Sequence, residues 1–204
     1  MEIPFSPASD RNKEPILKVL QEVLTLNTGR ILEIGAGTGQ HAVYMSPYFP
    51  QLKWTMSDRA EVVPALKRVV EEANLRNLTP PFKLEIGVDD VAKFIYDIIY
   101  TANTFHIMSW KECKTLIKLA GHRLPEEGRF IVYGPFNYDQ KFTSESNEAF
   151  DKSLRERDPA SGIRAFEDVD RAMVKNGFAL VKDYEMPANN RVLVYKRLKF
   201  VRKT

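Results

Sequence analysis

Apolar and polar positions alternate along the chain in two periods, which predicts helices and strands in turn. Residues 15–25 place six apolar side chains on one stripe of a helix, and the apolar run at 30–34 is typical of a buried strand. The other expected elements are helices at 41–46, 61–73, 110–120, 145–157 and 166–176, and strands at 52–56, 82–86, 96–101, 129–133, 179–184 and 191–195. Strands that alternate with helices favour a mostly parallel α/β sheet.

Prolines and glycines set the expected ends of several elements. Pro15 suits the first turn of a helix, Pro80-Pro81 is expected to break the chain before the strand at 82–86, and Gly134-Pro135 is expected to end the strand at 129–133. Asn189-Asn190 suits a tight turn between the last two strands. The long connection 136–163 predicts an insertion near the substrate side, because long loops at the ligand edge of a sheet usually serve a function.

Three glycines carry the clearest functional signal. Gly35, Gly37 and Gly39 follow a strand and precede a helix. Glycine adopts positive φ and lacks Cβ, so a flat cofactor can lie against its backbone, and the helix start aims N–H groups at the turn. A dinucleotide fingerprint needs glycine where Gln40 stands, so a nicotinamide or flavin site is the weaker alternative, beside a purely structural turn.

With Glu33 in the preceding strand, the pattern E-x-G-x-G-x-G resembles the first motif of class I S-adenosylmethionine-dependent methyltransferases. This resemblance implies a Rossmann-like seven-stranded sheet with an antiparallel last strand and helices on both faces. It also implies S-adenosylmethionine as cofactor and S-adenosylhomocysteine as product. The residues expected to bind the cofactor here are Glu33, Gly35, Ala36, Gly37, Gly39 and Gln40.

Acidic residues after the next two strands complete the expected nucleoside site. Asp58 lies at the distance downstream where a carboxylate can accept hydrogen bonds from a ribose diol. Its alternative role is to cap the helix that starts near Glu61. After the third strand, Glu85 or one of Asp89 and Asp90 can accept from an adenine amino group.

The end of the fourth strand mixes polar and aromatic residues, which is typical of a pocket wall. Asn103 can bind the amino-acid end of the cofactor, and Phe105 can pack on its apolar surface. His106 is the candidate general base because an imidazole accepts a proton near neutral pH; the alternative is a half-buried residue that holds a loop carbonyl. Tyr133 is a weaker candidate base. Trp110 is either a core anchor or a substrate platform.

Six short stretches resemble the family called domain of unknown function 938, which is methyltransferase-like and has no assigned substrate. They are Arg11-Asn12-Lys13 with Pro15-Ile16-Leu17, Gly37-Thr38-Gly39-Gln40-His41, Tyr133-Gly134-Pro135-Phe136, Phe142-Thr143-Ser144, Arg157-Asp158-Pro159 and Glu185-Met186-Pro187-Ala188-Asn189-Asn190. Ala165 and Met56 depart from the family, where an acid and a proline are usual.

Two of these stretches add candidate substrate or lid residues. Arg11, Asn12 and Lys13 can fold over the pocket and donate to a carboxylate, or can merely cap a helix and contact solvent. Phe136 follows the expected end of the fifth strand, at the ligand edge of the sheet.

The composition limits the expected number of domains, the compartment and the cofactors. A chain of 204 residues with 44% hydrophobic and 28% charged residues predicts one globular domain, 1–204, with 1–29 as N-terminal lid and helix. No signal peptide or membrane span is expected, so the cytoplasm is the expected compartment. Cys113 stands alone and the three histidines lack the spacing of a helical zinc pair, so no metal is expected.

The formal charge of +3 comes from the end of the chain. Six basic residues and no acid lie in the last fourteen positions, which leaves −3 for residues 1–190. This tail can contact nucleic acid or an acidic partner, but a solvated final strand is favoured. The basic residues are Arg191, Lys196, Arg197, Lys199, Arg202 and Lys203.

These patterns predict an S-adenosylmethionine-dependent methyltransferase that transfers a methyl group in line to an unidentified small-molecule acceptor. Much of the rate of such a reaction can come from orientation. An aromatic pocket with few fixed charges suits a small, neutral or weakly acidic acceptor. The alternatives are a noncatalytic S-adenosylmethionine-binding or protein-interaction module and, less favoured, an NAD-dependent oxidoreductase. Neither nucleic acid nor membrane is an expected partner.

Overall fold

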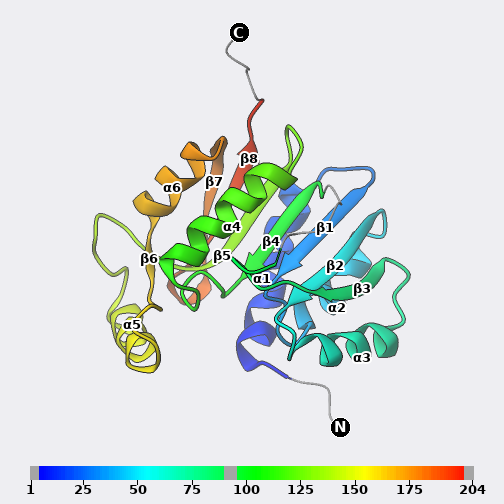
Figure 1. The fold of residues 1–204 in the computed structure, drawn as a ribbon, viewed down its shortest axis with the longest axis horizontal. Helices are drawn as coiled ribbons and strands as arrows, with labels where there is room; N and C mark the ends of the chain where they lie inside the picture. Colours follow the sequence, from blue (N-terminus) through cyan, green and yellow to red (C-terminus); the bar gives the residue numbers. More distant parts are fainter. Residues whose placement is uncertain (1–4, 90–95, 200–204) are drawn as a thin grey trace. The chain divides into compact units, whose positions relative to one another are not determined.

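A computed structural model describes residues 5–89 and 96–199 and divides the chain into two compact units, Met1–Thr101 and Ala102–Thr204 (Figure 1). Both units combine helices with strands. The strands are mostly parallel in the first unit and end in an antiparallel set in the second, so the predicted α/β fold class is confirmed. That the chain is a single domain stays a prediction.

The first unit contains four parallel strands in the order β3-β2-β1-β4. The central strand β1 (Gly29–Ile34) pairs with β2 (Leu52–Asp58) and with β4 (Ile98–Ala102). The last four residues of β1 are buried. Because β1 and β2 end in register, with Ile34 opposite Ser57, whatever follows each strand meets at one edge of the sheet.

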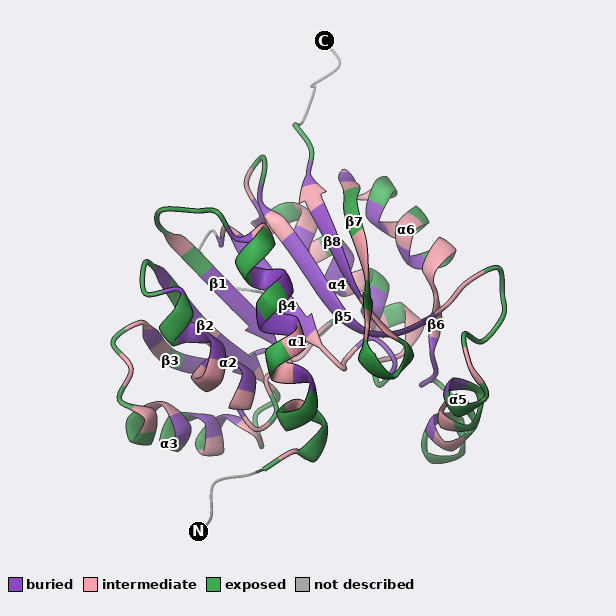
Figure 2. Cartoon of the chain, turned by 180° about the vertical axis from the view of Figure 1, so that it is seen from behind, coloured by how far each residue is buried: buried purple, intermediate pink, exposed green. Residues whose placement is uncertain are grey.

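The helices of the first unit are α1 (Pro7–Val23), α2 (Gln40–Met45) and α3 (Val63–Ala73), with a short 3-10 turn, η1 (Ser46–Tyr48), after α2. In Figure 2, α1 and α2 lie in front of the strands of this unit. The prediction that a helix starts at Pro15 is wrong: α1 begins eight residues earlier, where the Ser6 hydroxyl accepts a hydrogen bond from the Ser9 N–H. Pro15 therefore lies inside the helix.

The prediction that Pro80-Pro81 precedes the third strand is also wrong. Both prolines lie within β3 (Leu78–Lys83), which is the edge strand of this unit. Thr55 and Ser57 of β2 are two positions apart, but their partners Thr79 and Phe82 are three positions apart, so β3 carries an irregularity at the prolines. Proline is tolerated at edges and bulges because no ladder hydrogen bond is needed there.

The second unit contains β5 (Arg129–Asn137), β8 (Asn190–Arg197) and β7 (Phe178–Met186), paired antiparallel in that order. A two-residue strand, β6 (Arg164–Ala165), pairs with β5 and was not predicted. Figure 2 shows β5 and β8 buried along most of their length and β7 largely exposed. The helices are α4 (Trp110–Arg123), α5 (Glu145–Arg157) and α6 (Phe166–Lys175).

Of the two turns predicted for the second unit, one is wrong and one is confirmed. The strand at 129–133 does not end at Gly134-Pro135, because both residues continue the ladder opposite Arg191 and Asn190. The tight turn between the last two strands is confirmed as the 3-10 turn η2 (Pro187–Asn189). Its left-handed residues are Ala188 and Asn189, one position earlier than the predicted pair.

Three of the described basic residues at the end of the sequence form ion pairs with acidic residues of the same chain. Arg191 pairs with Asp183 and Glu185, and Lys196 pairs with Glu127. Lys199 pairs with Glu126. Arg202 and Lys203 lie outside the described residues. Along 5–89 and 96–199, no helix has both the length and the apolar character needed to cross a membrane.

Arg197 is the most deeply buried member of this tail, at 7% exposure, and its guanidinium donates to the carbonyl oxygens of Gly121 and Gly177 at 2.9 and 2.7 Å. We expect Arg197→Met to lower the free energy of unfolding by roughly 2–4 kcal/mol, because buried carbonyls lose charged donors. Lys196→Met removes only an exposed ion pair and should cost less than about 1 kcal/mol. Urea unfolding of both variants measures the difference, and equal losses would contradict this assignment.

Candidate cofactor site

The glycine turn is tied to the end of β2 by its own backbone. The N–H groups of Gly35 and Ala36 both donate to the carbonyl oxygen of Ser57, at 2.9 and 3.2 Å. The φ angles of Gly35, Gly37 and Gly39 are +70°, +55° and +73°. Because residues with Cβ rarely adopt these angles, the turn needs glycine at all three positions.

Two of these glycines have different surroundings. A Cβ on Gly39 would lie 3.0 Å from the Val69 side chain and 3.2 Å from that of Leu66, so this glycine lets α2 approach α3 closely. A Cβ on Gly37 would meet nothing within 4 Å, and Gly37 is exposed. Gly37 is therefore the part of the turn that offers bare backbone to a ligand.

Asp58, the last residue of β2, contacts this open part of the turn. Its Oδ2 accepts the Gly37 N–H at 2.7 Å, and its Oδ1 accepts the Arg59 N–H at 2.8 Å. Each carboxylate oxygen keeps a second lone pair for a ligand hydroxyl. The alternative role of Asp58 as a helix cap is wrong, because α3 begins at Val63 with Val62 as its N-cap.

Glu33 lies beneath the turn and is only 2% exposed. Its Oε2 accepts the indole N–H of Trp54 at 2.8 Å. Burial, with a smaller contribution from the Asp58 charge, raises the pKa of Glu33 to about 8, although the Trp54 hydrogen bond acts to lower it. Glu33 therefore carries a proton at neutral pH.

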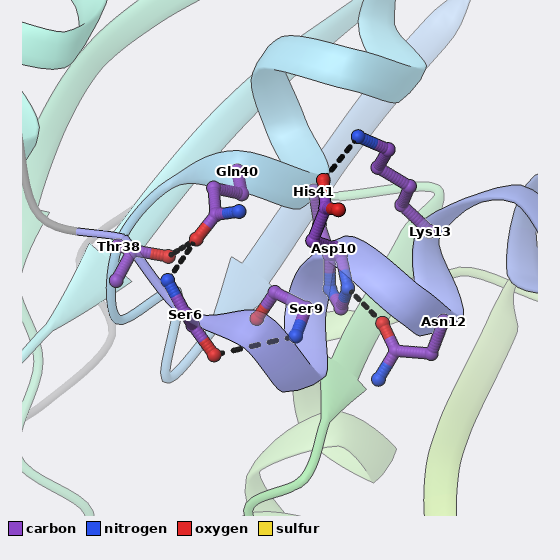
Figure 3. Close-up of polar contacts among 8 residues, drawn as sticks. All are labelled: Ser6, Ser9, Asp10, Asn12, Lys13, Thr38, Gln40 and His41. Carbon is purple, nitrogen blue, oxygen red and sulfur yellow. Dashed lines mark hydrogen bonds and ion pairs between the residues drawn. The ribbon is translucent and has the colours of Figure 1, made fainter.

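The start of α1 also contacts the glycine turn and the beginning of α2 (Figure 3). The Gln40 side-chain oxygen accepts from the Ser6 N–H and from the Thr38 hydroxyl, the latter at 2.9 Å. His41 Nε2 and Asn12 Oδ1 are 2.6 Å apart in a buried hydrogen bond.

The other two residues of the stretch 11–13 point elsewhere. Arg11 is exposed, and Lys13 pairs with Asp10 while its Nζ lies 5.0 Å from the centre of the Tyr44 ring. Asn12 is therefore the member of this stretch that the structure brings to the turn. Lys13, Thr38, Gln40 and Tyr44 also line an open groove of about 770 Å³ between α1, α2 and α3.

Of the acids after the third strand, Asp89 is engaged locally. It accepts the Glu85 N–H at 2.8 Å and pairs with Lys83 at 3.2 Å, and the first of these contacts is the main reason that its pKa is lowered. Glu85 is half-buried, and within the described part of the chain its carboxylate has no hydrogen bond or ion pair. Asp90 lies outside the described residues.

Several candidates in the second unit lie in its core. Phe105 is 2% exposed, and its ring lies 6.3 Å from that of Phe130 and 6.5 Å from that of Phe136. Phe136 and Tyr133 are buried as well. Asn103 adopts a left-handed conformation, with φ +58°, and its N–H donates to the Tyr133 carbonyl at 2.9 Å. Their roles toward ligands stay predictions.

His106 is buried at 5% exposure, with its ring edge-on to Phe150 at 5.2 Å. Burial lowers its pKa to about 4, and the positive charges of Arg164 and Arg157 lower it further. Its Nδ1 has no hydrogen-bond partner in the described part of the chain. His106 is thus a neutral imidazole whose Nδ1 is buried without a described partner, and its role as base stays a prediction.

Trp110 is half-buried at the start of α4, with Lys114 Nζ 5.9 Å from the centre of its ring. Both interpretations of Trp110 stay open. No group of three or more His, Cys, Asp or Glu side chains is placed to hold a metal ion within 5–89 and 96–199.

Sequence reasoning missed the residues that fix the loop at 103–109. Arg164 donates to the carbonyl oxygens of Phe105, at 3.0 Å, and of Met108. The Ser161 hydroxyl donates to the Ile107 carbonyl at 2.6 Å. Arg164 directly precedes Ala165, where the sequence departs from the family, and this neighbouring departure is the signal in the sequence that could have found it.

The fold matches solved structures over most of the chain. An O-methyltransferase family protein from Burkholderia thailandensis matches 95% of this chain and 58% of its own, with a TM-score of 0.81 and 14% identity. An O-methyltransferase family 2 protein from Planctomyces limnophilus, in complex with apigenin, matches 93% and 62%, with a TM-score of 0.74 and 15% identity. Human N-acetylserotonin methyltransferase, in complex with S-adenosylmethionine, matches 94% and 53%, with a TM-score of 0.76 and 16% identity.

The chain therefore has the fold of class I S-adenosylmethionine-dependent methyltransferases, although it spans little more than half the length of these proteins. Residues 3–197 match the family described as protein of unknown function (DUF938), and the chain belongs to that family.

The protonated state of Glu33 makes a testable contribution to stability. Its pKa is about 8 in the folded chain and near 4.5 in the unfolded one, so the folded state holds an extra proton and stability falls as pH rises between these values. Glu33→Gln keeps an acceptor for Trp54 and removes the titration. We expect the variant to gain roughly 3–5 kcal/mol over wild type between pH 5 and pH 8.

Urea unfolding of both proteins at pH 5, 6, 7 and 8 measures this gain. The buried histidines His41 and His106 titrate equally in both proteins, so the difference isolates Glu33. A difference that does not change with pH would show that Glu33 is ionised in the folded protein.

Proposed function

We propose that this protein is an S-adenosylmethionine-dependent methyltransferase that acts on a small-molecule acceptor. The observation that carries the proposal is the contact of Asp58 Oδ2 with the Gly37 N–H, at 2.7 Å. It places an acid that can accept ribose hydroxyls beside the one stretch of bare, open backbone in the turn. The residues present therefore fit the cofactor.

The cofactor roles divide among named residues. Gly35, Ala36, Gly37 and Gly39 form the turn, and Asp58 accepts from the ribose. Of the two described acids after β3, Glu85 is the better candidate for the adenine amino group, because Asp89 is already bonded to the Glu85 N–H and to Lys83. Asn103 and Phe105 remain proposed contacts of the amino-acid end.

The acceptor is proposed to carry a hydroxyl group. S-adenosylmethionine, when bound, supplies an electrophilic methyl group on sulfur. The chain must then orient the acceptor and remove its proton. His106 is the proposed base because it is neutral and its buried Nδ1 has no hydrogen-bond partner in the described part of the chain. The O-methyltransferase names of the similar structures, one of them with bound apigenin, support a small acceptor of this kind.

A noncatalytic S-adenosylmethionine-binding module is the second candidate. The observation that favours it is the burial of both proposed bases, His106 and Tyr133. An NAD-dependent oxidoreductase has less support, because the position that needs a third glycine holds Gln40, whose side chain is committed to Ser6 and Thr38.

Isothermal titration tests the proposal with S-adenosylmethionine, S-adenosylhomocysteine, NAD and NADP. We expect the first two to bind and Asp58→Ala to weaken both at least about tenfold, since a charged acceptor of two hydroxyls is lost. Glu61→Ala is the matched control, because Glu61 is an exposed neighbouring acid paired only with Arg59; it should change affinity less than about twofold. Failure of the sulfur compounds to bind, or tight binding of NAD, would refute the proposal.

A further inference from the structure

Two of the family stretches meet in one buried hydrogen bond between α1 and α2. Asn12 comes from the stretch 11–13, and His41 ends the stretch 37–41. Both side chains are buried, at 9% and 5% exposure, and Figure 3 shows them facing each other across the two helices. Helix capping and solvation therefore do not account for Asn12.

The partners of His41 define its state. Asn12 Oδ1 can only accept, so His41 Nε2 carries the hydrogen. Tyr100 lies on the other side, with its hydroxyl 3.2 Å from His41 Nδ1, where it donates to a neutral ring. Burial lowers the pKa of His41 to about 4, which agrees with this neutral tautomer at pH 7.

The chain of contacts continues beneath the glycine turn. The Tyr100 ring packs edge-on against Trp54 at 6.0 Å, and Trp54 donates to Glu33. Tyr100 and Glu33 are also opposite each other in the β1–β4 ladder. Asn12 and His41 thus connect α1 to the three strands that support the turn.

Helix α2 needs such external support. It has six residues, its N-cap Gly39 provides no side-chain hydrogen bond, and its first turn contains no acid. A helix this short is marginal by itself. Its first two residues, Gln40 and His41, hydrogen-bond to Ser6 at the N-cap of α1 and to Asn12 within α1.

We propose that Asn12 and His41 are positioning residues of the cofactor site, and that α1 holds the glycine turn and the start of α2 in the conformation that binds S-adenosylmethionine. This rests on the proposed function for the identity of the ligand. The ordering of the turn by α1 does not depend on it.

Three variants separate positioning from general stability. Asn12→Leu has nearly the same size and removes the side-chain acceptor of His41 Nε2, while the ring retains its contacts with the Ser9 backbone and Tyr100. Asn12→Asp keeps an acceptor at that place. Val19→Ala is the matched control, because Val19 is buried in α1 and the substitution weakens packing without touching His41. Thermal unfolding of all three variants shows how much stability each one loses, so that variants with similar losses can be compared.

Two measurements are made on each variant and on wild type. The first is the Kd for S-adenosylhomocysteine, which should rise at least about tenfold in Asn12→Leu, return to within about threefold in Asn12→Asp, and change less than about twofold in Val19→Ala. The second is amide hydrogen exchange of Gly37, Gly39 and Val43 in the ligand-free protein. Exchange should be at least about tenfold faster in Asn12→Leu and close to wild type in the other two.

The outcomes distinguish the two proposals. If wild type does not bind S-adenosylhomocysteine, the proposed function fails, and the exchange rates still decide whether Asn12 orders the turn. If wild type binds and Asn12→Leu matches Val19→Ala in both affinity and exchange, the positioning role is refuted and Asn12 only stabilises α1.

Discussion

The candidate site depends on one carbonyl oxygen, that of Ser57, which accepts the backbone N–H groups of Gly35 and Ala36. These two hydrogen bonds fasten the glycine turn to the end of β2. Asp58 follows Ser57 directly, so the same attachment brings its carboxylate to the Gly37 N–H. The Ser57 hydroxyl in turn donates to the Glu33 carbonyl at 2.9 Å, which completes the link between the two strand ends.

Much of this site is predictable from sequence because it is local. The residue type of Gly35, Gly37 and Gly39 is enough to predict positive φ angles. An acid at the end of the next strand, here Asp58, is expected to reach the turn. The positions of Pro15 and Pro80-Pro81 were not predictable in this way. A proline ends a strand only where its missing N–H is needed, and at the edge strand β3 it is not needed. Pro15 lies inside α1, where its residue type alone would have predicted a break.

The contact of Asn12 with His41 could not be predicted from the sequence for a different reason. The residues are 29 positions apart, and their pairing follows from the packing of α1 against α2. The sequence identified both stretches as distinctive but gave no means to join them. Phe105 and Phe136 are buried in the second unit with their rings 6.5 Å apart, and their expected contacts with a ligand stay predictions.

Hydrogen bonds also join family stretches within the second unit. The Asn147 amide donates to the Thr143 hydroxyl and to the Asn189 carbonyl, at 2.8 and 3.2 Å. Buried Asp151 accepts the Ile163 N–H at 2.7 Å and pairs with Arg155. Asn147 and Asp151 are one helical turn apart, so these contacts fix one face of α5, and α5 is a packed part of this unit. The Asn147 contacts therefore join two of the family stretches, 142–144 and 185–190.

The most direct test of the account is a crystal structure of the protein with S-adenosylhomocysteine. The account predicts the ligand against the backbone at Gly37, with both ribose hydroxyls hydrogen-bonded to the Asp58 carboxylate. A ligand bound elsewhere, or one whose ribose does not contact Asp58, would contradict the assignment of the glycine turn as the cofactor site.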